Sequence, residues 1–153
     1  MDIMMRAIGR VEGGRVAAED DRWGGEEAVI RLDPAVVGPE ALLGLDAFSH
    51  CEVVFQFDRL PEAEITTNAR HPRGNPAWPR VGILAQRGRN RPNRIGVSVA
   101  EVLAVDGLAL HVRGLDAIAG TPVLDVKPVM AGFLPRGDLR EPEWAQALMA
   151  DYW

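Results

Sequence analysis

The sequence has few of the residues that support sulfur or hydroxyl chemistry. Among its 153 residues there is one cysteine, Cys51, and the only serines are Ser49 and Ser98. A single cysteine cannot form an internal disulfide, which is the usual condition of cytosolic proteins. With so few serines and no Gly-x-Ser-x-Gly run, a serine hydrolase is a poor match. We therefore expect a cytoplasmic protein whose chemistry does not depend on a serine or cysteine nucleophile.

Long apolar runs and the common phosphate-binding loops are also missing. No run approaches the ~18 apolar residues that a membrane helix needs, and residues 1–10 have no apolar core like that of a signal peptide. Neither Gly-x-x-x-x-Gly-Lys-Ser/Thr nor Gly-x-Gly-x-x-Gly occurs. His50 and Cys51 are neighbours on an expected strand, so they point to opposite faces and make a poor shared metal site. The sequence predicts no membrane partner and no metal.

Acidic residues are absent from one long segment. The whole chain has a net charge of −5, but no Asp or Glu lies between Glu64 and Glu101. That segment carries +7 and the remaining 10 basic and 22 acidic residues carry −12. GC-rich codon usage explains the preference for arginine over lysine, but it does not explain the missing acids. A guanidinium fits phosphate and carboxylate groups, so we expect a local anion-binding face. Its arginines are Arg70, Arg73, Arg80, Arg87, Arg89, Arg91 and Arg94.

The pattern of apolar residues indicates short strands. In residues 49–58, Cys51, Val53, Phe55 and Phe57 alternate with polar side chains, which is typical of a half-buried strand. Asp106-Gly107 between residues 95–105 and 108–112 is typical of a hairpin turn. Further strands are expected at 7–11, 28–32, 81–86 and 123–126, with a helical turn at 39–45 and a long loop at 59–79.

The end of the sequence has a different pattern. Trp144, Leu148 and Tyr152 recur every four residues, which predicts an amphipathic helix over residues 141–152. With a composition of 47% hydrophobic and 25% charged residues, the chain has the character of one globular domain. The predicted fold is mainly β: a single small antiparallel β-barrel over residues 1–153, with short helices and the C-terminal amphipathic helix.

Polar residues of unusual density occur in three places. His71 begins a His-Pro-Arg-Gly run inside the long loop, and residues 87–96 contain four arginines. Arginines this close repel one another unless an anion lies among them, although a solvated loop is the alternative. Asp125 and Lys127 share one strand face, where they either form a site or pair with each other on the surface.

These segments together resemble the TrmO-type (YaeB/TsaA-like) tRNA methyltransferase family. The resemblance covers roughly residues 3–130, with the motifs in the order of the family. The matching residues are 44–50, 71–74, 81–83, 91–93, 95–98, 114–116 and 120–128. The chain differs from the usual family pattern at Asn90, Arg94 and Ala119, so it is similar to a divergent branch.

The resemblance implies a homodimeric barrel that binds S-adenosyl-L-methionine. It also implies methylation of N6 in threonylcarbamoyladenosine, beside the tRNA anticodon. The residues carried over as cofactor contacts are Arg87, Val97, Ala119, Gly120, Thr121 and Pro122, with Asp58 and Arg59 at the end of the long strand. Trp23 is a further candidate, for stacking on the cofactor adenine, with a role in packing as the alternative.

The implied reaction needs a proton acceptor and a grip on an anionic substrate. Asp125 or Asp116 can accept the N6 proton. Arginines would hold the phosphates and the threonyl carboxylate, and Trp78 either stacks on a splayed base or packs in the loop. The predicted substrate contacts are His71, Arg73, Arg91, Asn93 and Lys127. Two alternatives remain open: a methyltransferase of this fold acting on another small anionic substrate, and a non-catalytic barrel that binds cofactor or RNA.

Overall fold

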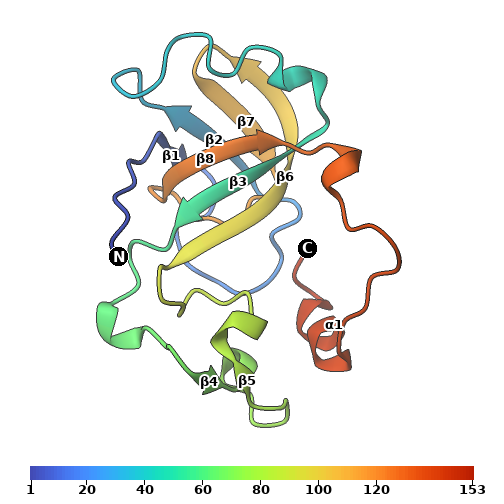
Figure 1. The fold of residues 1–153 in the computed structure, drawn as a ribbon. Helices are drawn as coiled ribbons and strands as arrows, with labels where there is room; N and C mark the ends of the chain where they lie inside the picture. Colours follow the sequence, from blue (N-terminus) through green and yellow to red (C-terminus); the bar gives the residue numbers. More distant parts are fainter.

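Six antiparallel strands form a closed barrel in the computed structural model, which describes residues 1–153 (Figure 1). Neighbouring strands around the barrel follow the order β1-β2-β7-β6-β3-β8, and β8 closes the ring by pairing with β1. This arrangement confirms the mainly β fold predicted from the sequence. The strands are β1 (Gly9–Glu12), β2 (Glu27–Leu32), β3 (His50–Gln56), β6 (Ile95–Asp106), β7 (Ala109–Arg113) and β8 (Pro122–Pro128).

Alternation along the strands fills the barrel. On β3, Cys51, Val53 and Phe55 are at most 1% exposed, while Glu52 between them faces solvent. Each buried Val or Phe contributes about 1.5–3 kcal/mol relative to an exposed one. Residues from all six strands complete this core, together with Leu42, Leu115 and Ala117 from the loops. The predicted pattern of β3 is therefore confirmed, with Phe57 packed against the edge of the core.

Strand β6 is the longest strand of the barrel, with 12 residues. Its first half pairs with β3 and its second half with β7. A register shift between Val102 and Ala104 interrupts the pairing of β6 with β7, and such bulges increase local bending. Gly96 faces the barrel interior opposite Phe55, and a Cβ there would lie 2.4 Å from the Phe55 ring.

A small lobe of loops and short elements is attached to one end of the barrel, as Figure 1 shows. It contains the two-stranded sheet of β4 (Ala69–Arg70) and β5 (Val81–Gly82), with the 3-10 turns η2 (Glu62–Glu64), η3 (Pro72–Gly74) and η4 (Ile83–Ala85). The helix α1 (Glu143–Met149) lies at the same end, whereas the 3-10 turn η1 (Leu45–Ala47) belongs to the opposite end. A fifth 3-10 turn, η5 (Ala131–Phe133), follows β8.

Most element predictions are confirmed, with shifts of one or two residues at their ends. The strand predicted over 81–86 is wrong beyond Gly82, because residues 83–85 form the turn η4. The predicted long loop 59–79 contains β4 and two 3-10 turns, since β4 finds its partner β5 only in the folded chain. The helix predicted over 141–152 is shorter, covering Glu143–Met149. No helix in the chain has the length and apolar character required to span a membrane.

Candidate functional site

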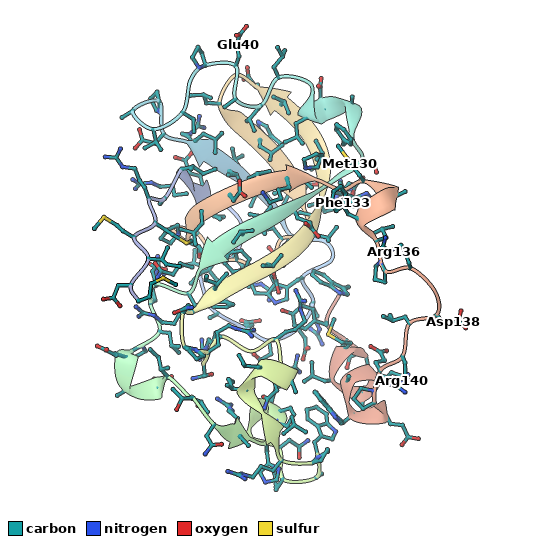
Figure 2. The ribbon with its side chains drawn as sticks, in the orientation of Figure 1. Glu40, Met130, Phe133, Arg136, Asp138 and Arg140 are labelled. Atoms are coloured by element: carbon teal, nitrogen blue, oxygen red, sulfur yellow. The ribbon has the colours of Figure 1, made fainter.

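The barrel topology gathers most of the predicted site residues at one end. Strands β1, β3 and β7 end there, and β2, β6 and β8 begin there, as the antiparallel registers require. The loops at this end are therefore residues 13–26, 57–94 and 114–121. Figure 2 shows Glu40 in a loop at the opposite end of the barrel. We refer to the first group as the site loops.

Two of the site loops are joined by Arg59. Its guanidinium donates a hydrogen bond to the Ala119 carbonyl oxygen at 2.9 Å, across 60 residues of sequence. Gly120 follows with a φ of +90°, and a Cβ there would lie 2.7 Å from the Arg59 Nη2 atom. Thr121 is buried, and its carbonyl oxygen accepts a hydrogen bond from the Val11 amide at 3.0 Å. The structure thus places three predicted cofactor contacts, Arg59, Ala119 and Gly120, side by side.

A second pair of predicted cofactor contacts is also in direct contact. Arg87 donates a hydrogen bond to the Val97 carbonyl oxygen at 2.5 Å. The Val97 side chain points outward from β6, whereas its neighbour Ser98 points inward and is 5% exposed. Asp58 lies next to Arg59 and is exposed. Guanidinium and carbonyl groups at this end can hold the carboxylate and ammonium ends of an amino-acid moiety.

Asp116 lies between hydroxyl groups from two distant segments. One carboxylate oxygen accepts a hydrogen bond from Ser98 of β6, and the other accepts one from the phenol of Tyr152. Burial, followed by the charge of Asp116 and this hydrogen bond, raises the pKa of Tyr152 above its ordinary value. The Tyr152 hydroxyl therefore remains a donor over the ordinary pH range.

Asp125 is in a different place from Asp116. It faces outward from β8, where the Lys127 ammonium lies 2.6 Å from one oxygen and the Val126 amide donates to the other at 2.9 Å. The hydrogen bond to Asp125 raises the pKa of the exposed Lys127. Val54 separates Asp125 from Val97 on the outer face of the sheet. Asp125 and Lys127 therefore form a surface pair, which was one of the two alternatives that the sequence left open.

A groove of about 410 Å³ lies beside Asp125. Its walls are mainly apolar and include Leu42, Phe48 and Val126. Asp125 is the only predicted site residue that lines it. The two carboxylates proposed as proton acceptors consequently do not form one site.

The predicted substrate contacts in the arginine-rich loop differ in whether their side chains are bonded to other residues of the chain. The His71 Nδ1 atom lies 2.7 Å from the Trp78 carbonyl oxygen, so the imidazole holds its own loop closed. Arg73 forms an ion pair with Asp21 at 2.8 Å and lies over the Tyr152 ring at 5.9 Å. Arg91 donates to the Gln86 carbonyl oxygen at 3.2 Å. Asn93 is exposed and Trp78 is partly exposed.

Trp23 has the packing role that the sequence left as an alternative. Its side chain is 4% exposed, and its indole nitrogen donates to the Glu19 carbonyl oxygen at 3.1 Å. The Arg15 guanidinium lies 4.1 Å from the ring centre. The ring has no exposed face for an adenine in this structure, and stacking of Trp23 on the cofactor stays a prediction.

Three residues at this end were not predicted from the sequence. Arg15 holds the loop 13–26 by donating to the carbonyl oxygens of Asp21 and Arg22 and to the Glu26 carboxylate. Ser98 and Tyr152 both bond to Asp116. Tyr152 is the only tyrosine of the chain, and this rarity was a usable signal. Because 36 residues separate Tyr152 from Asp116 in the sequence, their contact could not be predicted.

The barrel and its site loops define a class of small β-barrel protein. Comparison with known proteins identifies the family. The family model described as the tRNA-methyltransferase O N-terminal domain matches residues 20–133. The chain belongs to this family. Its match includes every predicted site residue, whereas Tyr152 and α1 lie outside it.

Individual relatives agree with this assignment. A human tRNA (adenine(37)-N6)-methyltransferase is 36% identical over 102 residues, which is 67% of this chain and 23% of that protein. A probable S-adenosyl-L-methionine-binding protein of Methanothermobacter thermautotrophicus is 35% identical over 132 residues, covering 84% of this chain and 90% of the relative. The crystal structure of TrmO from Pseudomonas aeruginosa superposes with a TM-score of 0.72 at 26% identity, covering 92% of this chain and 62% of that one.

The relatives differ in how much of their length this chain spans. It covers less than a quarter of the human enzyme, but nearly all of the archaeal binding protein.

Proposed function

We propose that this chain is an S-adenosyl-L-methionine-dependent methyltransferase that methylates N6 of an adenine in tRNA. Threonylcarbamoyladenosine next to the anticodon is the proposed substrate nucleoside. The observation that carries the proposal is the meeting of Arg59, Ala119 and Gly120 at one end of a barrel of this family. The names of the relatives support the cofactor and the tRNA substrate.

The chemistry of the site loops fits the proposed cofactor. Its methionine carboxylate suits the guanidinium groups of Arg59 and Arg87, and its ammonium and ribose hydroxyls suit carbonyl and carboxylate oxygens such as those of Val97 and Asp58. Bound there, S-adenosyl-L-methionine supplies a methyl group already activated on a sulfonium. The protein then has to orient the acceptor nitrogen and receive its proton.

We propose Asp116 rather than Asp125 as that proton acceptor. Asp116 is three residues from Ala119 and is bonded to Ser98, next to Val97. Its partners are the neutral hydroxyl groups of Ser98 and Tyr152. Asp125 instead lies on the outer barrel wall, with an ammonium group 2.6 Å from one of its oxygens.

We propose that the arginines of the small lobe hold the tRNA. Arg80 and Arg89 are exposed and donate no hydrogen bond to the rest of the chain, so both guanidinium groups are free to bind phosphate. The acidic remainder of the surface would limit binding of RNA elsewhere. The proposed substrate contacts remain those predicted from the sequence, which are His71, Arg73, Arg91, Asn93 and Lys127. Of these, His71 and Arg73 contribute by holding the loop in its conformation.

We further propose that the protein is a cytoplasmic homodimer built from one domain per chain. Val97, Val99 and Leu103 are outward-facing apolar residues of β6, each more than a third exposed. A second copy packed there would remove this surface from water. Sedimentation of the wild type and of Val99→Glu tests the idea, since a dimer using this face becomes monomeric in the variant. A wild-type monomer would contradict it.

The function is tested with the purified chain, radiolabelled cofactor and tRNA from a strain lacking the endogenous enzyme. We expect label in methylated threonylcarbamoyladenosine, identified by mass spectrometry of the nucleosides. Asp116→Asn should lose most activity, and Asp125→Asn should retain most of it. Arg91→Ala should weaken substrate use more than cofactor affinity. Binding of cofactor without label transfer to any tRNA would instead favour the cofactor-binding barrel suggested by the archaeal relative.

A further inference from the structure

The last residues of the chain return to the site loops. The Arg22 amide donates to the Asp151 carbonyl oxygen at 2.9 Å, and the Trp23 amide donates to the Tyr152 carbonyl oxygen at 2.8 Å. Figure 1 shows this segment running from α1 back beneath the barrel. A Cβ at Gly24 would lie 2.8 Å from the backbone of Trp153, so glycine is what permits the close approach.

Docking of this segment places one side chain against the proposed catalytic carboxylate. The phenol of Tyr152 donates to Asp116, whose other oxygen accepts from the buried Ser98. The Trp153 ring packs edge-on against Tyr152 at 4.9 Å, and Arg73 lies on another side. Asp116, to which Ser98 also donates, Arg73 and the adjacent Trp153 thus surround one phenol.

Filling of space does not account for the hydroxyl group. Phenylalanine would fill the same space, and an aspartate in a loop at the barrel end can be hydrated without a tyrosine. Together with the hydrogen bond from Ser98, the contact from the Tyr152 hydroxyl instead fixes both oxygens of Asp116, leaving the remaining lone pairs of the carboxylate to accept a proton. Holding a base in one orientation lowers the entropic cost of using it.

We infer that Tyr152 is a positioning residue for methyl transfer, acting through Asp116. The inference rests on the proposed function. In the step it supports, the S–CH₃ bond breaks with its electron pair remaining on sulfur, and the N6–CH₃ bond forms. The N6–H bond breaks and its proton goes to Asp116, while the hydrogen bond from Tyr152 holds the carboxylate in place.

The test compares Tyr152→Phe, Asp116→Asn and the double variant. We expect Tyr152→Phe to lower kcat roughly tenfold, the effect of one hydrogen bond to a charged group, while the Kd for S-adenosyl-L-methionine stays within about twofold. The double variant should be no slower than Asp116→Asn alone, because both changes act on one group. Asp138→Asn, in the solvent-facing loop seen in Figure 2, is the matched control for removal of a carboxylate.

A second measurement does not depend on how well Tyr152→Phe folds. Because the chain has one tyrosine, growth on 3-fluorotyrosine changes residue 152 alone and makes its phenol more acidic with little change in shape. We expect kcat to change, because the more acidic phenol is a different hydrogen-bond donor to Asp116, and a packing role would not produce this change.

The possible failures are distinguishable. Full activity in Tyr152→Phe, additive effects in the double variant, or an unchanged kcat with fluorotyrosine each overturn the role of Tyr152 alone. A wild-type protein that binds cofactor and methylates no tRNA overturns the proposed function together with this inference.

Discussion

The Arg59 guanidinium and the Ala119 carbonyl oxygen are 2.9 Å apart, although 60 residues separate them in the sequence. This hydrogen bond joins the end of β3 to the loop before β8, and Gly120 lies directly beside it. The resemblance to the family proposed both segments as cofactor contacts. It did not show that the two segments touch each other.

Gly120→Ala should weaken cofactor binding through this contact. The added Cβ would lie 2.7 Å from Arg59 and would force alanine to adopt a φ of +90°, at a cost of about 1–3 kcal/mol of stability. Calorimetry with S-adenosyl-L-methionine should show weaker binding, and denaturation should show the loss of stability. Gly82→Ala is a control, since Gly82 has a negative φ of −58° and open space at its Cβ. Equal affinity in both variants would place the cofactor elsewhere.

Gly96→Ala should destabilise the barrel by overpacking. The new methyl group would lie 2.4 Å from the Phe55 ring, and such insertions cost about 1–3 kcal/mol. Urea denaturation measures the change in the free energy of unfolding. Adding Phe55→Leu should recover part of it, because the smaller side chain leaves room for the methyl group. If the second change only adds further destabilisation, the steric explanation is wrong.

Alkaline pH should destabilise the protein through Tyr152. Its pKa is raised above the usual value of 10.0 by burial, by the charge of Asp116 and by their hydrogen bond. The unfolded chain therefore releases the phenolic proton first, so the contribution is complete below pH 10.0 and is lost as pH rises from there. Denaturation midpoints of the wild type should fall more steeply with pH than those of Tyr152→Phe. Parallel curves would mean that the phenol is unperturbed.

The same phenol gives a spectroscopic check. The tyrosinate absorption band in the near ultraviolet reports Tyr152 alone, since no other tyrosine is present. Asp116→Asn should move its ionisation to lower pH, because the nearby negative charge is removed. Asp138→Asn should leave the titration where it is.

Cys51 should be unreactive in the folded protein. It is 0% exposed, and burial raises its pKa to about 11, so both access and thiolate formation are suppressed. A thiol reagent should label the native chain only at the rate of unfolding and the denatured chain at once. Rapid labelling of the native protein would show that the barrel opens at β3.

Arg80 and Arg89 should contribute to tRNA affinity through phosphate. Substituting either by alanine should weaken binding and reduce the slope of log K against log salt by roughly 1, as measured by filter binding. Arg136→Ala is the control, in the solvent-facing loop outside the arginine-rich segment (Figure 2). Equal losses in all three variants would indicate non-specific charge attraction.

The sequence by itself determined the strands and the family. The alternation at Cys51, Val53 and Phe55 is local information, because successive side chains of a strand point to opposite faces. The Asp106-Gly107 hairpin and the ordered motifs are also local patterns, so the sequence alone could predict them. The +7 segment was also a property of the sequence alone, although it did not show which arginines are free.

Tertiary structure decided what the site is made of. Barrel closure brings Arg59 to Ala119 and Tyr152 to Asp116, while it leaves Asp125 outside with Lys127. Trp23 becomes buried because Arg15 and the docked C-terminal segment enclose its loop. The strand expected beyond Gly82 became a turn. The contacts of Arg59 with Ala119 and of Tyr152 with Asp116 join residues that are distant in sequence, and no local pattern carries information about such contacts.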